Sequence, residues 1–519
     1  MEVHSFSPCA VLVSLFLFIL MISILMGTVS ESSRNPGPPG PRKLPFIGNL
    51  HLLASRTIPP HHMLRNLAKK YGPVMHLQLG EISTLVISSK ESAEEVLKTH
   101  DLAFASRPSL LGAEILFYGC KDLAFSPYGE YWIQMRKITA LQLLGAKQVQ
   151  SLRRIREKEA LNLCGWIASN AGSTIHLSER LITTNYDILC RSSLGEKSNE
   201  HEKLLSIIKE AVEALGGFDI TDLYPTYKLL HLFSGLKGRL ERIHTDADQT
   251  LEHIIHQHKQ AAMNAYSSKV VEREQEETEN LLDVLLKLQK EGAPDLDQVP
   301  LTTENIKAMI LVLFFAGSEA TSTTLDWAMS EMLKNPSILK RAQQEVRKVL
   351  DENLSKVDET FLDKLMYLKL VIKETLRLHP PAPLLLPREC MESSEVSGYK
   401  IPVKTRVMIN TWAIGRDPRY WQDAESFIPE RFLESNVDYK GNDFEFIPFG
   451  AGRRMCPGMV HGLVVVEFQL ALLLYHFDWS LVGSMKPEDI DMTETFGASA
   501  RRKNRLYVIP TVMRPLAVE

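Results

Sequence analysis

Apolar residues recur every three or four positions along most of this chain, with charged residues between them, as they do in amphipathic α-helices. The stretches with this pattern are residues 149–168, 201–215, 236–265 and 335–351. Residues 75–88 alternate instead, on either side of Gly80 and Glu81, which predicts a short antiparallel hairpin. We therefore expect a mainly α-helical fold with minor β-sheets.

Residues 303–333 form the strongest predicted helix, because they are apolar on all sides and follow Thr302, a residue suited to capping a helix. A helix that is apolar all round is expected to be buried on every face. Gly317 lies in its middle, although a mid-helix glycine costs about 1 kcal/mol relative to alanine. The pattern therefore indicates that a large group lies close to the helix at this glycine.

The amino-terminal segment predicts a membrane anchor and a stiff spacer. Residues 9–29 carry no charge and are long enough to cross a bilayer as a helix. A cleaved signal peptide, the alternative, begins with basic residues, which this start lacks. Arg34, Arg42 and Lys43 follow the apolar run, so we expect the rest of the chain in the cytosol. The proline-rich residues 35–41 cannot continue the helix.

We divide the chain on this basis into three parts without an internal domain boundary. They are an anchor at residues 1–30, a proline-rich hinge at residues 31–50 and one large domain at residues 51–519, with internal loops expected at residues 269–279 and 292–300. The net charge of -4, with acids and bases interspersed, gives no sign of nucleic-acid binding. The 6 cysteines lack paired spacing, which argues against a disulfide framework.

Residues 449–458, Phe-Gly-Ala-Gly-Arg-Arg-Met-Cys-Pro-Gly, carry the clearest chemical signal. Cys456 lies in a glycine-punctuated loop whose backbone N–H groups can point at the sulfur, and Arg454 offers a cation to a carboxylate. A cysteine thiolate bound to haem iron donates electron density and favours cleavage of an oxygen–oxygen bond. A lone Cys-Pro-Gly sequence would instead indicate a surface turn with a packed cysteine.

This stretch matches F-x-x-G-x-R-x-C-x-G at every fixed position and is similar to the haem-binding signature of the cytochrome P-450 family. The resemblance implies the fold of that family and haem b, with Cys456 as the axial ligand and Phe449, Arg454 and Gly458 as further cofactor contacts. It also implies a monooxygenase that uses NADPH and O2. No dinucleotide-binding motif occurs in the chain, so an NADPH-cytochrome reductase is the expected electron donor, with cytochrome b5 as a further candidate. Anchored members of the family lie in the endoplasmic reticulum membrane, with the catalytic domain in the cytosol.

Three more residues have a cofactor role only through this resemblance. Trp132 and Arg136 form W-x-x-x-R, which in the family grips a haem propionate. Arg388 is a further propionate candidate by its place in the pattern. Without the family context, a surface arginine lying along an apolar side chain would be the better interpretation of the first motif.

A structural charge triad is implied in the same way. Glu374 and Arg377 match the family's E-x-x-R, and Arg431 in Pro-Glu-Arg-Phe completes the buried triad that holds the cysteine loop. Taken alone, Glu374 and Arg377 would form a surface ion pair worth about 0.2–0.5 kcal/mol.

Residues 316–321 resemble the family segment A/G-G-x-D/E-T, which passes over the distal face of the haem. The family's threonine helps to organise proton delivery to bound dioxygen, but Ala320 replaces it here and has no hydroxyl group. Glu319 and Thr321 are therefore the catalytic candidates for proton delivery. Thr321 points about 100° away from position 320 on a regular helix, so it can replace the missing group only where the helix bulges.

The segments at the family's substrate-facing positions are mostly apolar, which favours an apolar substrate. Further motifs, P-F-G-A-G-R-R-M-C-P-G-M and W-A-I-G-R-D-P, resemble A-type plant members that include terpenoid hydroxylases, so we expect a sesquiterpene or diterpene. The residues expected to line the pocket are Leu110, Ile115, Phe117, Phe218, Phe314, Ala316, Ala320, Ala382, Leu384 and Phe496.

Other functions stay open at this point. A phenylpropanoid, flavonoid or alkaloid substrate fits the same motifs. Ala320 also fits a haem-thiolate isomerase, dehydratase or lyase that needs no reductase, because such members of the family often lack the distal threonine. The membrane anchor and the uninterrupted cysteine loop argue against that class. A non-catalytic haem-binding protein is the third class.

Overall fold

The computed structural model describes residues 37–55, 57–195, 198–215, 219–227, 235–267, 279–292, 300–352 and 358–516. The predicted anchor at residues 1–30 and the predicted lining residue Phe218 lie outside these ranges, as do most of the two expected internal loops. Within these ranges the chain is mainly α-helical with small β-sheets, as the sequence pattern predicts.

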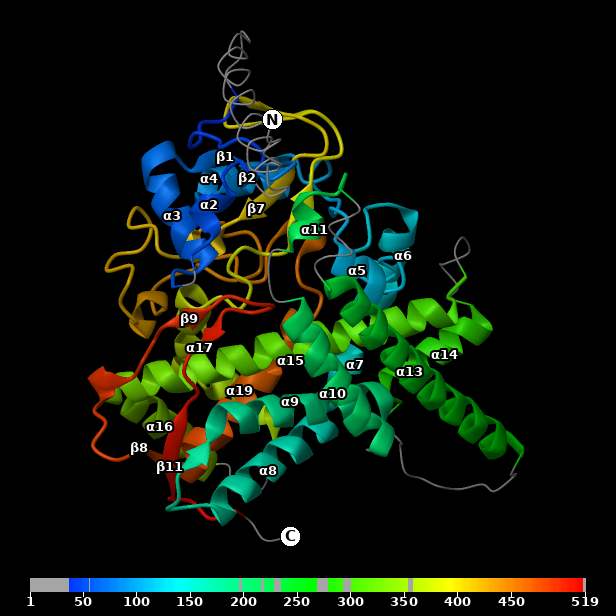
Figure 1. The fold of residues 1–519 in the computed structure, drawn as a ribbon. Helices are drawn as coiled ribbons and strands as arrows, with labels where there is room; N and C mark the ends of the chain where they lie inside the picture. The colour runs from blue at the N-terminus through cyan, green and yellow to red at the C-terminus, as the bar shows by residue number, and fades with distance from the viewer. Residues whose placement is uncertain are drawn as a thin grey trace, which may run out of the picture.

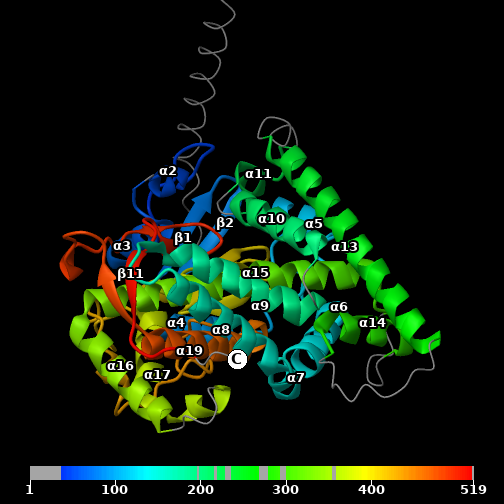
Figure 2. The ribbon, with the colours of Figure 1, turned by 90° about the horizontal axis from the view of Figure 1, so that it is seen from below.

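Helix α15 (Thr303–Lys334) runs through the middle of the molecule, and α9 (Leu177–Leu194) and α19 (Met459–His476) pack against it (Figures 1 and 2). Its predicted cap is confirmed, because the Thr302 hydroxyl accepts a hydrogen bond from the Asn305 N–H. The other described α-helices are α2 (Leu50–Leu53), α3 (Pro60–Tyr71), α4 (Lys90–Glu94), α5 (Leu111–Leu116), α6 (Glu130–Ile138), α7 (Ala146–Ser151), α8 (Arg153–Ser169), α10 (Asn199–Ala214), α11 (Ile220–Leu223), α13 (Leu236–Ser267), α14 (Leu281–Glu291), α16 (Pro336–Asp351), α17 (Met366–Leu378) and α18 (Thr411–Ile414).

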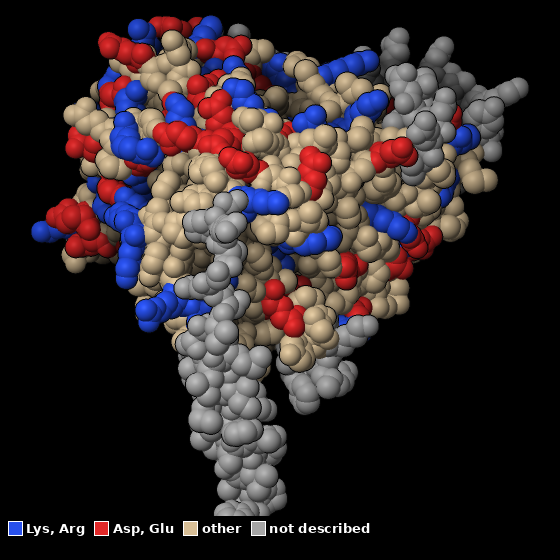
Figure 3. Space-filling view, turned by 90° about the horizontal axis from the view of Figure 1, so that it is seen from above, with Lys and Arg blue, Asp and Glu red and all other residues tan. Residues whose placement is uncertain are grey.

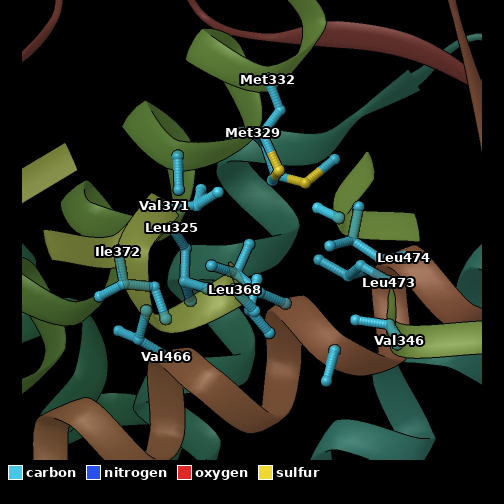
Figure 4. Close-up of a cluster of buried hydrophobic side chains, with 14 of the residues drawn as sticks. Leu325, Met329, Met332, Val346, Leu368, Val371, Ile372, Val466, Leu473 and Leu474 are labelled. Carbon is cyan, nitrogen blue, oxygen red and sulfur yellow. The ribbon is translucent and has the colours of Figure 1, made fainter. Parts of the chain in front are cut away.

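The largest apolar core lies between helices from the second half of the chain (Figure 4). Leu325 and Met329 of α15 meet Leu368 of α17, Val346 of α16 and Leu473 of α19 there, all with almost no exposed surface. Burying each such side chain contributes about 1.5–3 kcal/mol to stability. This core fixes α15, α17 and α19, which are the helices next to the cysteine loop and the charge triad.

The four-stranded sheet lies at one end of the molecule, beside α3 and α4 (Figure 1). Its strand order is β1-β2-β7-β4, in which β1 and β2 form the predicted hairpin around Gly80 and β2 pairs with β7 in parallel. The strands of all described sheets are β1 (Val74–Leu79), β2 (Ile82–Ile87), β3 (Ile175–His176), β4 (Arg388–Glu389), β5 (Ser394–Val396), β6 (Tyr399–Ile401), β7 (Arg406–Ile409), β8 (Phe477–Leu481), β9 (Glu494–Thr495), β10 (Arg501–Arg502) and β11 (Tyr507–Val512).

The single helix predicted at residues 149–168 is wrong, because the chain forms α7 and α8 with a break at Leu152. The side chain of Arg156 stabilises this break, since its Nη1 donates to the carbonyl of Val149 at 2.7 Å. Leu152 is fully buried at the corner. The other three predicted helices and the central one agree with α10, α13, α16 and α15 to within two residues at each end.

The described part of the proline-rich hinge is attached to the sheet. The His76 N–H of β1 donates to the Pro39 carbonyl at 2.8 Å, and the Asn49 N–H donates to the Gln78 carbonyl at 2.6 Å. The Asn49 side chain also donates to the carbonyls of Pro41 and Arg42. Residues 37–50 therefore lie along β1, and this part of the chain is not a free spacer.

Two described helices, α15 and α19, are long and apolar enough to cross a membrane, and both are mostly buried inside the protein, as core helices are. The expected membrane segment at residues 9–29 lies outside the described residues. Basic and acidic side chains are interspersed over the face seen in Figure 3, in keeping with the small net charge.

Candidate functional site

The cysteine loop precedes α19 and takes its shape from backbone contacts. The Cys456 N–H donates to the Phe449 carbonyl at 3.0 Å and so closes the loop on itself. Gly452 has a φ of +67°, and a Cβ atom there would lie 2.3 Å from the Leu97 carbonyl oxygen and 2.6 Å from an Asp101 carboxylate oxygen. Only glycine fits this close approach and this backbone conformation.

The thiol of Cys456 faces the interior of the protein. Its side chain is exposed, whereas the other described cysteines, Cys120, Cys164, Cys190 and Cys390, are buried. Burial among protein atoms nevertheless raises the pKa of this thiol, while a hydrogen bond from the Gly458 backbone N–H and the charge of Arg136 act in the opposite direction. This thiol is accessible although protein atoms surround it. It therefore faces a space inside the protein and not bulk solvent.

Four arginines gather at this loop, and three of them come from distant segments. Arg454 donates to the carbonyls of Ala105 and Ser126 at 2.7 and 2.6 Å. Arg388 pairs with Asp101 at 2.9 Å and donates to the Ala451 carbonyl. The other two members of the group are Arg136, which lies close enough to Cys456 to interact with its charge, and Arg107, which donates to the carbonyls of Ala124, Leu386 and Pro387.

Positive charge exceeds negative charge in this described cluster. Burial and the neighbouring Arg388 lower the pKa of Arg454 to about 9, and burial lowers the pKa of Arg107 as well. The nearby acids are Asp101 and Asp122, and burial raises the pKa of Asp122 to about 6. Buried cations without partner anions are unfavourable. A haem b with two propionates would supply such anions, so the donor set fits this cofactor.

Trp132 is placed differently from the sequence expectation. Its indole N–H donates to the Leu123 carbonyl at 3.0 Å, and the guanidinium of Arg454 stacks over its ring at 4.1 Å. The indole therefore supports Arg454, whereas Arg136 points toward Cys456. Arg107 and Asp101 were not identified from sequence, because no motif spacing marks them and only the fold brings them to the loop.

The middle of α15 is not buried on every face, contrary to the sequence expectation. Ala316 is exposed, and Leu313 and Ala320 are partly exposed, although most other residues of this helix are buried. These three residues lie at spacings of three and four and therefore share one face. Gly317 packs against a neighbouring helix, since a Cβ atom there would lie 3.1 Å from Leu189 of α9. A leucine side chain therefore lies close to the helix at Gly317.

The two catalytic candidates point away from that face. The Glu319 carboxylate pairs with Arg501 and accepts a hydrogen bond from Ser499 at 3.3 Å, and burial raises its pKa. Thr321 is directed toward α19, where its hydroxyl lies 3.9 Å from the position of a Cβ atom on Gly462. α15 is a regular α-helix here, so the bulge that would bring Thr321 to the position of Ala320 does not occur.

A ring of contacts joins the cysteine loop to α15. On one side, Phe315 of α15 contacts Phe117 at 6.1 Å, and Phe117 stacks on Phe125 at 5.5 Å. The segment just before Phe125 carries the Leu123 carbonyl, which accepts hydrogen bonds from Trp132 and Arg454. This side of the ring therefore leads from the helix to the arginine cluster.

The other side of the ring is formed by the β9–β10 hairpin. Ser499 contacts Glu319 of α15, and the next residue, Ala500, donates its N–H to the Pro381 carbonyl at 2.9 Å. Leu385, four residues further along, lies 3.6 Å from the position of a Cβ atom on Gly450 in the cysteine loop. Contacts on both sides thus link α15 to the loop that carries Cys456.

The predicted lining residues divide into two groups. Four of them, Leu110, Ile115, Phe117 and Phe314, belong to one apolar cluster, which also contains Leu313 and Trp132. Leu384 and Phe496 belong instead to a cluster with side chains of β1 and β7. Ala382 belongs to neither, and its carbonyl accepts the Leu385 N–H. The structure therefore brings together the residues from the first part of the chain and α15.

The three residues of the predicted charge triad lie together, with Glu374 and Arg377 buried and Arg431 partly buried. Both oxygens of Glu374 accept hydrogen bonds from Arg377, at 2.7 and 2.8 Å, and one also accepts from Arg431 at 2.9 Å. Arg377 further donates to the carbonyls of Gly415 and Ala424. Its fifth N–H group donates to the Ser426 carbonyl, so no shorter or differently shaped side chain can form the same set of hydrogen bonds.

An aromatic chain connects the triad to the cysteine loop. The guanidinium of Arg377 lies over the Trp421 ring at 5.2 Å, and this ring contacts Phe446 at 6.2 Å. Phe446 contacts Tyr439, which in turn contacts Phe449 at the start of the loop at 5.7 Å. Displacing the triad therefore shifts the support of the loop that carries Cys456.

Comparisons with known proteins agree with this geometry. The family model described as cytochrome P-450 matches residues 38–508. Salviol synthase from Salvia pomifera is 49% identical over 99% of both chains, and premnaspirodiene oxygenase from Hyoscyamus muticus is 48% identical over 97% of this chain and 98% of that one. Desmethyl-deoxy-podophyllotoxin synthase from Sinopodophyllum hexandrum is 52% identical over 96% of both chains. A solved structure of a zebra fish cytochrome P-450 with progesterone superposes with a TM-score of 0.72 at 27% identity, over 88% of this chain and 100% of that chain.

Proposed function

The chain belongs to the cytochrome P-450 family, and on that premise we propose that it oxidises a terpenoid, with a sesquiterpene or diterpene skeleton as its substrate. As a member of the family it is a haem-thiolate monooxygenase, which uses haem b, O2 and electrons from a reductase. The proposed reaction site lies between Cys456 and the exposed face of α15.

The chain's own residues hold the cofactor in this proposal. Cys456 is the iron ligand, and the Gly458 N–H and Arg136 favour its thiolate form. Arg107, Arg388 and Arg454 offer cations to the propionates. When bound, thiolate-ligated haem supplies the oxygen-activating chemistry.

The observation that carries the substrate proposal is the apolar face of α15. Leu313, Ala316 and Ala320 are its accessible residues, and none can form an ion pair or a side-chain hydrogen bond. The partly buried Leu110 and Ile115 pack against the same apolar cluster as Leu313. An apolar hydrocarbon skeleton fits such walls, because its burial releases water from both surfaces. The names of salviol synthase and premnaspirodiene oxygenase support the same substrate class.

A second substrate class has specific support. The relative with 52% identity is named desmethyl-deoxy-podophyllotoxin synthase, so a phenylpropanoid-type, flavonoid or alkaloid substrate is the runner-up. A reductase-independent isomerase or dehydratase is the runner-up for the reaction type, because Ala320 replaces the hydroxyl expected for oxygen activation.

We also propose that the chain is held in the endoplasmic reticulum membrane by residues 1–30, with residues 51–519 in the cytosol. The uncharged run at residues 9–29 and the basic residues after it support this orientation. Lys137 is exposed and Arg453 is half-exposed near the cysteine loop, so they offer positive charge to the docking reductase, with cytochrome b5 as a second donor.

The test is a panel of sesquiterpenes, diterpenes, phenylpropanoids, flavonoids and alkaloids, added to membranes that contain the chain and its reductase. We expect one terpenoid group to shift the spin state of the ferric haem and to yield an oxygenated product only with NADPH. The exchange Ala316→Leu should weaken that spin-state titration about tenfold or more, whereas Ala171→Leu on the exposed surface should leave it unchanged. Turnover of another class alone, or turnover without NADPH, contradicts the proposal.

A further inference from the structure

Three histidine side chains converge on the carboxylate of Glu494, the first residue of β9. One oxygen of this carboxylate, Oε2, lies 2.6 Å from His61 Nε2 and 3.1 Å from His62 Nε2. The other oxygen, Oε1, lies 3.5 Å from His379 Nδ1. The histidines belong to α3 and to the residue that follows α17, and β9 lies between these two helices (Figure 1). The fold therefore brings three imidazole rings from distant segments to one carboxylate.

Most of this cluster is buried, and one side of it reaches solvent. His61 is fully buried, and the side chains of His379 and Glu494 are 6% and 5% exposed. The side chain of His62 is 33% exposed, and its ring stacks on Trp412 at 3.9 Å. The cluster is thus held in place by the protein interior and is accessible beside His62.

The His379 ring has a buried nitrogen that lacks a hydrogen-bond partner among the described residues. Its Nε2 lies 2.7 Å from a carboxylate oxygen of Glu331, which places the proton of the neutral ring on that nitrogen. Trp327 stacks on the ring at 3.8 Å and fixes its orientation. Nδ1 then carries a lone pair, has no partner and faces an oxygen of Glu494. These two electron-rich atoms repel each other unless a proton or a cation lies near them.

The ligand types and their spacing suit a zinc ion. Zn²⁺ prefers imidazole nitrogens and carboxylate oxygens, at about 2.0–2.2 Å. The ligand atoms of His61, His62 and Glu494 all lie within 4.8 Å of one another. Tetrahedral ligands at such bond lengths are about 3.3–3.6 Å apart, so the two contacts with Glu494 need to lengthen by about 1 Å or less. Burial lowers the pKa of His61, although its contact with Glu494 raises it, so this ring is neutral and keeps a lone pair for a metal ion.

The charges around the cluster are compatible with a cation. Arg416 stacks on the Trp412 ring at 3.9 Å, and its charge is paired with Glu425 at 3.1 Å. The carboxylates of Glu494 and Glu331 contact histidines. Their negative charge offsets part of the cost of placing a dication in the protein interior.

We propose that His61, His62 and Glu494 bind one Zn²⁺ ion, which ties α3 to the β9–β10 hairpin. His379 Nδ1 completes the fourth position, directly or through a water molecule. Zinc takes the place of the protons that otherwise join the two rings of α3 to the carboxylate. Phe496 lies two residues after Glu494, and its ring is 6.1 Å from that of His61, so the ion also fixes the part of the hairpin that carries this predicted lining residue.

Zinc binding by the purified, haem-containing enzyme tests the proposal. The enzyme is first treated with a chelator, then dialysed against Zn²⁺, and its metal content is measured by atomic spectroscopy. We expect one zinc ion per haem with a dissociation constant of about 1 µM or tighter, and a thermal midpoint raised by about 2 °C or more. The exchange His62→Gln should weaken binding about 100-fold or more and remove the thermal shift, because glutamine replaces a ligand with a poor one.

His253→Gln is the matched control, since His253 and His256 lie close together on the exposed side of α13 and can bind zinc at the surface. This variant should bind zinc as the unaltered enzyme does. Zinc binding that survives in His62→Gln, or that is lost in His253→Gln, would overturn the proposal. The same holds if the chelator-treated enzyme binds no zinc, because protons alone then join the cluster.

Two further measurements protect this test from a folding defect. Glu494→Gln keeps the shape of the side chain and should also lose zinc, while the haem content of both variants reports whether they fold. The X-ray absorption spectrum at the zinc edge should show nitrogen and oxygen neighbours at about 2.0–2.2 Å, with scattering from imidazole rings that decreases in His62→Gln. Sulfur neighbours at about 2.3 Å would place the ion at a cysteine and contradict the assignment. No substrate is needed, so these results are independent of the proposed oxidation.

Discussion

Gly452 is the residue of the cysteine loop with the least freedom to change. Its φ of +67° disfavours any side chain by about 1–2 kcal/mol, and an added Cβ would also lie 2.3 Å from the backbone carbonyl of Leu97. We predict that Gly452→Ala costs about 3 kcal/mol or more in stability and yields protein with little bound haem. The haem-to-protein absorbance ratio of the purified variant and its thermal midpoint are the measurements.

Gly483→Ala is the matched control for this exchange. Gly483 has nearly the same φ, +66°, but nothing lies within 4 Å of an added Cβ. The control should therefore lose about 1–2 kcal/mol and retain its haem. Equal loss of haem in both variants would mean that backbone conformation, and not the contact with Leu97, makes glycine necessary in the loop.

Individual residues differed in how far the sequence could identify them. Cys456 and Arg454 lie within one short motif, so their spacing alone marks them. Arg107 and Asp101 reach the cysteine loop only because distant segments fold onto it, through contacts with residues 386–387 and with Arg388. No periodicity or local motif encodes such contacts. The direction of the Thr321 side chain likewise depends on whether α15 is regular or bulged at this residue. The sequence left both possibilities open, and the structure shows a regular helix.

At the scale of elements, the charge triad on α17 supports the cysteine loop through buried ion pairs. We predict that Arg377→Ala destabilises the protein by about 3–5 kcal/mol, because it leaves Glu374 buried with one of its two cationic partners removed. The variant should contain almost no haem, as measured by its haem-to-protein ratio.

Arg242→Ala is the control for this prediction, because Arg242 forms an exposed ion pair with Glu210. Such pairs contribute about 0–1 kcal/mol, so the control should fold and bind haem normally. If Arg377→Ala does not fold, the haem content of Arg431→Ala tests the triad instead. This exchange removes one contact to Glu374 and leaves the others. Normal haem content in both triad variants would refute the role assigned to the triad.

Glu467 on α19 gives this helix a pH-dependent stability. Burial raises the pKa of its carboxyl group to about 7 from an ordinary value of 4.5. Between these values the folded state binds more protons than the unfolded state, so stability falls as pH rises and the loss is complete above about pH 7. We predict that Glu467→Gln removes this decline and gains about 1–3 kcal/mol relative to the unaltered protein between pH 5 and pH 8.

Thermal midpoints of the two proteins at pH 5 and pH 8 measure this difference. Glu434→Gln changes an exposed glutamate and is the control. A constant offset between Glu467→Gln and the unaltered protein at both pH values would show that the carboxyl group does not titrate differently in the folded state.

Elements with a long, regular pattern were predictable, and elements defined by tertiary contacts were not. α10, α13, α15 and α16 follow from the spacing of their apolar residues. The break between α7 and α8 depends on a side chain, Arg156, that binds a backbone carbonyl across the corner. The attachment of residues 37–50 to β1 also depends on strand pairing that no local pattern reveals.

For the whole molecule, the sequence motifs predicted the cofactor and reaction class, because the motifs recur in a family that matches residues 38–508. The arrangement of the site needed the fold. Contacts from α15 through Phe117 and Arg454 on one side, and through Ser499 and Leu385 on the other, link this helix to the cysteine loop. The apolar cluster beside α15 supports the proposal of an apolar substrate.

We infer that this chain inserts one atom of dioxygen into an apolar substrate at a Cys456-ligated haem. The most direct test is turnover of the terpenoid selected by the substrate panel, with reductase, NADPH and ¹⁸O₂, followed by mass analysis of the product. We expect one labelled oxygen atom per hydroxylation, strictly dependent on NADPH and abolished by Cys456→Ala. A product without the label, or one formed equally well without NADPH or by Cys456→Ala, would contradict it.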